Sequence, residues 1–217
     1  MSVHHRYGLA RVAFALLAMS ASASADSSKP HRGQDRASAY MRVYGSTLPP
    51  YGYVRFCEKF RTECARGVFD ETRFDAKGDR FAELDRINRE VNQIIEPATD
   101  LEIYGETEVW TLPTTRGDCE DYALLKRNRL RARGWPISAL LMTVVRDEKG
   151  EGHAVLTVRT AQGDYILDNK TDDIRPWHKA NYTWVMRQSY IDPNVWVSLD
   201  PKDASSPPLL SGMQPRR

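Results

Sequence analysis

Apolar residues recur at helical spacing in two parts of the chain. Between Phe81 and Ile95 they follow the period of about 3.6 residues of an amphipathic helix, which Pro97 ends. A second helix is expected to begin at Asp118 and to stop at the Gly-Trp-Pro sequence of 134–136. The apolar positions of the two helices are Phe81, Leu84, Ile87, Val91, Ile94 and Ile95 in the first, and Tyr122, Ala123, Leu124, Leu125 and Leu130 in the second.

The C-terminal half changes to short apolar runs that are typical of β-strands. Turn-forming residues at 147–150 and 161–164 separate the first three runs from one another. The expected strands are 137–145, 153–159, 165–168, 182–188 and 195–199. Helices followed by antiparallel strands indicate an α+β fold rather than an alternating βαβ fold.

The first 25 residues have the composition of a secretory signal peptide. Arg6 and Arg11 make a basic start, an apolar stretch covers 12–19, and small residues at 23–25 suit cleavage before Asp26. The stretch is much shorter than the roughly 20 residues that span a bilayer, so a membrane anchor is the weaker alternative. We therefore expect an exported protein whose mature chain does not insert into a membrane.

The ends of the mature chain are polar. Residues 26–37 and 201–217 are expected to be disordered, which leaves one domain over 38–200. Lys and Arg number 31 against 29 Asp and Glu, and two of the arginines lie in the signal peptide, so the remainder is neutral. This balance gives no reason to expect a nucleic acid as partner.

The three cysteines divide into a close pair and a single residue. Cys57 and Cys64 are seven residues apart, and an oxidising compartment favours a disulfide between them. A continuous helix would separate them by about 10.5 Å along its axis, whereas a disulfide needs Cα atoms within about 7 Å. The bridge therefore requires a break between the two residues, and the alternative is a pair of separate thiols.

Cys119 is the cysteine left over, and it stands at the expected start of the second helix. Asp118 suits the N-cap and Asp121 the N3 position of a capping box, which puts Cys119 at N1. There the helix dipole favours a thiolate, and the backbone N–H can face a developing oxyanion. The alternative is that Cys119 is a small buried apolar residue.

His153 and Asp168 are candidates for a base and its orienting acid. His153 begins a strand in which side chains alternate between two faces, with Val155 on the same face as His153. If the following turn has an even number of residues, Asp168 lies on that face too, within diagonal reach of His153. Asp168 would then orient the imidazole toward Cys119. The alternatives are a structural histidine and a turn-forming aspartate.

Four short motifs resemble one known family. They are Trp-Thr-Leu-Pro at 110–113, Gly-Asp-Cys-Glu-Asp-Tyr-Ala at 117–123, Gly-His-Ala-Val-Leu at 152–156 and Ile-Leu-Asp-Asn at 166–169. Together they are similar to the bacterial transglutaminase-like cysteine proteinases, which include the LapG-like periplasmic proteases. The resemblance implies a papain-like fold in which the nucleophile lies at a helix N-terminus packed on an antiparallel sheet. It also implies Cys119 as nucleophile, His153 as general base and Asp168 as orienting acid.

The acidic residues beside Cys119 raise the question of a metal. Asp118, Glu120 and Asp121 surround the thiol with negative charge, which opposes thiolate formation. Ca²⁺ bound to these carboxylates would remove that opposition. Members of the family that are calcium-dependent bind through acids that match Asp118 and Glu120. The alternative is that the three acids only cap the helix.

The resemblance implies a function for the whole chain. It indicates a calcium-dependent periplasmic cysteine peptidase that cleaves a periplasmic or cell-surface protein, for example an adhesin of a biofilm. An inner-membrane receptor is the expected regulator. Two alternatives share the fold: an acyltransferase that uses amines as acceptors, as transglutaminases do, and a calcium-binding module without catalysis.

Overall fold

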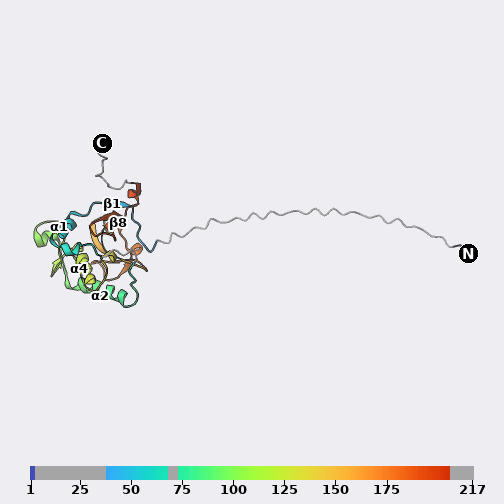
Figure 1. Ribbon diagram of the computed structural model, residues 1–217, viewed down its shortest axis with the longest axis horizontal. Coiled ribbons are helices and arrows are strands. Elements are labelled where there is room, and N and C mark those ends of the chain that lie inside the picture. The colour runs from blue at the N-terminus through green and yellow to red at the C-terminus, as the bar shows by residue number, and fades with distance from the viewer. Residues whose placement is uncertain (3–37, 68–72, 206–217) are drawn as a thin grey trace, which may run out of the picture. The chain divides into compact units, whose positions relative to one another are not determined.

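A computed structural model describes residues 1–2, 38–67 and 73–205 of the chain (Figure 1). The chain divides into the units Met1–Arg36 and Ala37–Arg217, and all the helices and strands described lie in the second. The expected signal peptide from residue 3 onward, the lead of 26–37 and the tail beyond residue 205 lie outside the described residues. Within the described part of the chain, no helix is long and apolar enough to cross a membrane.

Both helices that the apolar spacing predicts are present. The first is α2 and the second is α4, which begins at Cys119 as expected. Two others, α1 and α3, were not predicted. The α-helices are α1 (Tyr51–Lys59), α2 (Asp79–Ile94), α3 (Asp100–Tyr104) and α4 (Cys119–Ala132). Short 3₁₀ turns are η1 (Arg61–Glu63), η2 (Ile137–Ala139), η3 (Trp177–Lys179) and η4 (Pro201–Ser205), the last of which lies within the expected tail.

The strands of the larger sheet all pair antiparallel, in the order β1-β9-β8-β4-β5-β6-β7. They are β1 (Gly45–Thr47), β4 (Leu140–Arg146), β5 (Gly152–Thr160), β6 (Gly163–Leu167), β7 (Arg175–Pro176), β8 (Thr183–Gln188) and β9 (Trp196–Ser198). A separate pair, β2 (Glu96–Pro97) and β3 (Arg116–Gly117), is parallel. The α+β arrangement is therefore confirmed.

Two strand boundaries differ from the sequence prediction. Residues 137–139 form the turn η2, so β4 begins only at Leu140. The turn between β5 and β6 covers only residues 161–162, because Gly163 adopts a φ of 143° and already pairs with Thr160. This two-residue turn has the even length that puts Asp168 on the His153 face.

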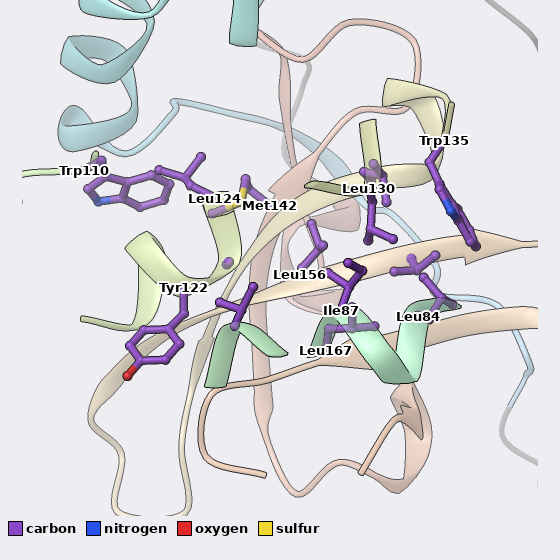
Figure 2. Packing of buried hydrophobic residues seen from close by; sticks show 14 of the residues in the cluster. Leu84, Ile87, Trp110, Tyr122, Leu124, Leu130, Trp135, Met142, Leu156 and Leu167 are labelled. Carbon is purple, nitrogen blue, oxygen red and sulfur yellow. The ribbon is translucent and has the colours of Figure 1, made fainter. Parts of the chain in front are cut away.

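Helices cover one face of the sheet, and the main core lies between the two layers. It contains Leu84 and Ile87 from α2, Leu124 from α4, and Leu156 and Leu167 from the sheet (Figure 2). A smaller cluster on the other face includes Val155 and Ile166. Leu156 and Val155 therefore point to opposite faces, as the alternation in the sequence predicts.

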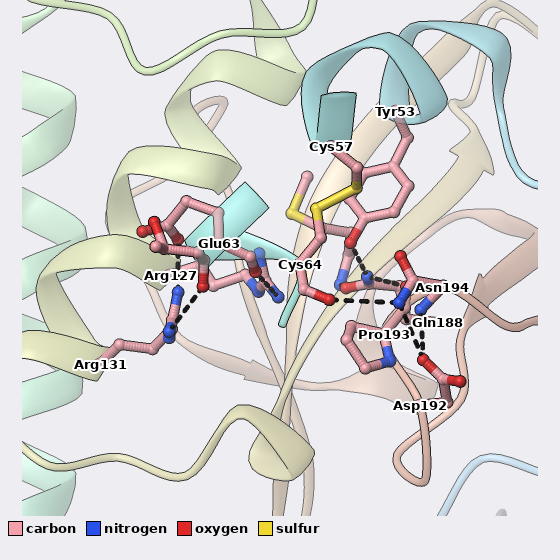
Figure 3. The surroundings of a disulfide bond; sticks show 12 residues. Tyr53, Cys57, Glu63, Cys64, Arg127, Arg131, Gln188, Asp192, Pro193 and Asn194 are labelled. Carbon is pink, nitrogen blue, oxygen red and sulfur yellow. Dashed lines mark hydrogen bonds and ion pairs between the residues drawn. A yellow bond between two sulfur atoms is a disulfide. The ribbon is translucent and has the colours of Figure 1, made fainter. Parts of the chain in front are cut away.

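The disulfide between Cys57 and Cys64 is present, with its Cα atoms 5.5 Å apart (Figure 3). The required break is at Phe60, whose φ of −115° and ψ of 61° end α1 before η1 begins. The bridge therefore holds η1 against α1. Glu63, the last residue of η1, in turn accepts a hydrogen bond from Arg131 of α4 at 2.7 Å.

Candidate active site

The segment that leads into α4 is tightly packed. Gly117 ends β3, and a Cβ atom there would lie 2.8 Å from Oδ2 of Asp121. Glycine is therefore required by space at this point of the motif. Asp118 occupies the N-cap position, but its side chain makes no capping hydrogen bond. The predicted capping box is wrong, because the Asp118 carboxylate has turned toward other acids.

Cys119 is the first residue of α4, and its sulfur contacts the start of β5. Sγ accepts a hydrogen bond from the backbone N–H of Ala154 at 3.3 Å and donates one to Oε2 of Glu120 at 3.1 Å. Burial and the negative charge of Glu120 raise the pKa of the Cys119 thiol well above its usual range. The neighbouring acids therefore oppose thiolate formation, as their positions in the sequence predict.

His153 and Asp168 are held together by the pairing of β5 with β6. The register places Leu156 opposite Leu167, so Asp168 follows on the same face as Val155 and lies diagonally across from His153. Nε2 of His153 and Oδ1 of Asp168 are 2.9 Å apart, and both side chains are almost fully buried.

The carboxylate of Asp168 has further donors. Oδ1 accepts the backbone N–H of Lys170 at 3.0 Å, and Oδ2 accepts the hydroxyl of Tyr182. Burial alone would raise the pKa of Asp168, but the hydrogen bonds from His153, from the Tyr182 hydroxyl and from the backbone N–H of Lys170 lower it below its usual value. Asp168 is therefore ionised and accepts the proton on Nε2, which leaves Nδ1 of His153 as the acceptor nitrogen.

Cys119 and His153 line one open cleft with a volume of about 600 Å³. Its apolar wall includes Pro50, Leu101 and Trp110. Trp110 belongs both to the main core and to the lining of the cleft. Its ring packs edge to face against Tyr53, and its Nε1–H donates a hydrogen bond to Oε2 of Glu108 at 3.3 Å. A thiol and an imidazole therefore line the same cleft.

A cluster of three carboxylates lies at the same cleft. Oxygen atoms of Asp100, Asp118 and Glu120 lie within 4.8 Å of one another. Asp100 Oδ1 and Asp118 Oδ1 are buried and have no hydrogen-bond partner among the described residues. Burial and the charge of Glu120 raise the pKa of Asp118 to about 8. The three carboxylates are therefore crowded, mutually repulsive and poorly compensated by the protein.

Asp100 was not singled out in the sequence, and no local motif marks it. It comes to the cluster because β2 pairs with β3, where Pro97 lies opposite Gly117. The backbone N–H of Ala98 then donates to the carbonyl of Gly117 at 3.0 Å, and Thr99 caps α3 with Asp100 as its first residue. This parallel pairing brings the two segments together.

Asp121, the third acid expected at the metal site, lies outside this cluster. Its Oδ1 accepts the backbone N–H of Thr111 at 2.8 Å, so it ties the Trp-Thr-Leu-Pro segment to the first turn of α4. Burial raises the pKa of Asp121 to about 8 despite this hydrogen bond. The structure therefore associates Asp121 with the loop that carries Trp110 rather than with the other carboxylates.

Comparison with known proteins gives a family and a set of similar structures. The profile of the family described as bacterial transglutaminase-like cysteine proteinase matches residues 43–204. No curated protein matches the chain. Calcium-bound LapG of Legionella pneumophila is 25% identical over 57% of this chain and 71% of its own, with a TM-score of 0.47. EGTA-treated LapG is 23% identical over 57% and 69%, with a TM-score of 0.43.

The family profile covers most of the described domain, from just before β1 into η4. It includes all four motifs that suggested the resemblance. The α+β architecture described above is the transglutaminase-like fold of this family. The chain belongs to the bacterial transglutaminase-like cysteine proteinases.

Proposed function

We propose that the protein hydrolyses peptide bonds with Cys119 as nucleophile, His153 as general base and Asp168 as the acid that orients it. One observation carries this proposal. The Cys119 thiol lies against the backbone of Ala154, next to a histidine that is bonded to a buried, ionised aspartate, and the thiol and the histidine line the same cleft.

The roles follow from the hydrogen bonds. Because Nε2 of His153 faces Asp168, Nδ1 is the nitrogen that can take the Cys119 proton. The thiolate attacks the substrate carbonyl, and His153 returns the proton to the leaving amine, which gives a thioester on Cys119. Water, deprotonated by His153, then hydrolyses the thioester and frees the thiol. The backbone N–H of Cys119, at the helix N-terminus, is the proposed oxyanion donor.

We further propose Ca²⁺ as the cofactor, held by Asp100, Asp118 and Glu120. Three crowded carboxylates, two of which have buried oxygens without partners among the described residues, are the donor set that a hard cation prefers. Bound Ca²⁺ would supply positive charge that offsets the acids beside the thiol. Asp121, which the sequence also suggested as a ligand, is assigned instead to the Thr111 loop.

The setting of the reaction is proposed from the resemblance and the N-terminal sequence. A cleavable signal peptide over 1–25 would deliver the protein to the periplasm. The disulfide between Cys57 and Cys64 suits that oxidising compartment. The proposed substrate is a periplasmic or cell-surface protein, such as a biofilm adhesin, and the proposed regulator is an inner-membrane receptor.

Product analysis tests this function against acyl transfer. Purified mature protein is incubated with a random peptide library in Ca²⁺, with and without a primary amine, and the products are identified by mass spectrometry. We expect new peptide termini that depend on Cys119 and are absent in Cys119→Ala. Amine-modified glutamine side chains without new termini would favour a transglutaminase. No product of either kind would favour a calcium-binding module.

A further inference from the structure

Tyr182 contacts the triad but has no part in the chemistry described so far. It lies immediately before β8 and donates its hydroxyl to Oδ2 of Asp168. The centroids of the Tyr182 and His153 rings are 5.5 Å apart. Trp184 packs edge to face on the same tyrosine, with ring centroids 6.1 Å apart, so the Tyr182 ring is fixed from two sides.

The two carboxylate oxygens of Asp168 accept hydrogen bonds from different donors. Oδ1 is occupied by His153 and by the backbone N–H of Lys170. For Oδ2, the Tyr182 hydroxyl is the donor that the described residues provide. A carboxylate held at only one oxygen can rotate about its Cβ–Cγ bond, and such rotation would disturb the hydrogen bond to His153. The bond from Tyr182 opposes this rotation.

A second cavity borders the carboxylate of Asp168. A cavity of about 470 Å³ is lined by Asp168 and Tyr182 together with Lys170 and Arg175. It shares no lining residue with the cleft that holds Cys119 and His153. Asp168 is nevertheless only 3% exposed. Both residues border this cavity, so the Tyr182 hydroxyl occupies Oδ2 at a place where water would otherwise compete for it.

We propose that Tyr182 is a positioning residue of the peptidase, which fixes Asp168 and, through it, the orientation and basicity of His153. This inference rests on the proposed function, because it assumes that His153 serves Cys119. Burial and the hydrogen bond to Asp168 raise the pKa of Tyr182, so its hydroxyl keeps its proton and remains a donor at neutral pH. Lys126, a buried cation, interacts electrostatically with the same carboxylate.

The test compares Tyr182→Phe, which removes only the hydroxyl, with Tyr40→Phe. Tyr40 also donates its hydroxyl, to the carbonyl of Ala161 at 2.7 Å, at the far end of the β5–β6 hairpin. The first readout is the imidazole pKa of His153, measured by NMR in a Cys119→Ala background. Without the hydrogen bond from the Tyr182 hydroxyl, the negative charge on Asp168 is less compensated and stabilises the protonated imidazole more strongly. The pKa of His153 should therefore rise by roughly one in Tyr182→Phe and stay unchanged in Tyr40→Phe.

The second readout is the rate at which iodoacetamide labels Cys119 across the pH range, with Ca²⁺ present. At the pH optimum, Cys119 in Tyr182→Phe should be labelled about tenfold more slowly, because one hydrogen bond to the charged Asp168 is lost. The pH profile of labelling should also move to higher pH, because the imidazole pKa of His153 is raised. Unchanged His153 pKa and labelling in Tyr182→Phe, or equal changes in Tyr40→Phe, would overturn the inference. A His153→Ala variant that labels like wild type would instead overturn the proposed function.

Discussion

Lys126 is a buried basic residue whose charge is poorly compensated by its surroundings. It lies on α4 with no exposed surface, and its Nζ has no hydrogen-bond partner among the described residues. Nζ lies 5.9 Å from the centroid of the Tyr122 ring. Burial lowers the pKa of Lys126 to about 7, although the negative charge of Asp168 opposes this change. A buried ammonium of this kind destabilises the fold when it carries its proton.

The Lys126→Met variant should therefore be more stable. The folded-state pKa lies below the unfolded value of about 10.4, so the folded protein binds fewer protons and its stability rises between those pH values. Removing the charge should raise the free energy of unfolding by about 1–4 kcal/mol at pH 7 and below. The gain should decline as pH approaches 10. Urea unfolding at several pH values measures it.

The control for this prediction is Lys77→Met. Lys77 has an exposed side chain, and its ion-pair partner among the described residues is the exposed Asp75 at 3.3 Å. Its replacement should change the free energy of unfolding by less than about 0.5 kcal/mol at any pH. A Lys126→Met gain that is absent, or that is the same at pH 6 and pH 10, would contradict the account of the buried charge.

The proposed calcium ligands can be separated by single substitutions. Asp100→Asn removes one of three clustered carboxylates, so we expect Ca²⁺ affinity to fall about tenfold or more, because affinity depends on ligand charge. Asp121→Asn leaves that cluster intact and should retain affinity close to wild type. Isothermal titration calorimetry measures both. Equal losses in the two variants would show that the ligand assignment is wrong.

At the scale of single residues, the sequence predicts the site residues that belong to a motif and misses those that do not. Helix start, strand face and turn length mark Cys119, His153 and Asp168. Cys119 begins α4 and His153 is hydrogen-bonded to Asp168, while their catalytic roles stay predictions. Asp100 and Tyr182 carry no local signal. One depends on the parallel pairing of β2 with β3, and the other on the path of the chain into β8.

At the scale of elements, the disulfide loop is the clearest case for a stability measurement. Cys57 and Cys64 close a loop of about eight residues between α1 and η1. In the chain-entropy estimate, a loop of this size contributes about 2–3 kcal/mol by restricting the unfolded chain. The Cys57→Ser, Cys64→Ser double variant should therefore lower the free energy of unfolding by about that amount in urea.

The control is wild-type protein with its bridge reduced and then reoxidised, which should lose and recover the same stability. Glu63 of η1 is also bonded to Asn128 of α4 at 2.9 Å, and the carbonyl of Glu63 accepts from Arg127 at 2.9 Å. These bonds would remain in the double variant. Unchanged stability after loss of the disulfide would show that they alone hold η1 in place.

Element prediction succeeded where periodicity was long and failed where pairing was remote. The 16-residue α2 shows a strong helical pattern, and the 14-residue α4 is marked by its apolar residues and by its start and stop signals. By contrast, β1 has only three residues, and its partner β9 lies about 150 residues later. The five-residue α3 is too short to show a period and depends on its Thr99 cap.

For the whole molecule, Ca²⁺ binding should be linked to stability. A ligand that binds only the folded state at 100 times its Kd stabilises it by about 2.7 kcal/mol. For a chain of this size that corresponds to a rise in Tm of roughly 5–10 °C. Thermal unfolding in Ca²⁺ and in EGTA measures the difference, and Asp100→Asn should reduce it. An equal Tm in both solutions would contradict a structural calcium site.

The central claim is that His153 activates Cys119, and it is tested most directly by labelling the thiol. Purified mature protein is treated with iodoacetamide at neutral pH, in Ca²⁺ and in chelator, as wild type, His153→Ala and Cys119→Ala. We predict fast labelling at Cys119 that needs both His153 and Ca²⁺, since burial and the adjacent acids otherwise hold the pKa of the thiol high. Slow labelling that is indifferent to His153 would contradict the peptidase account.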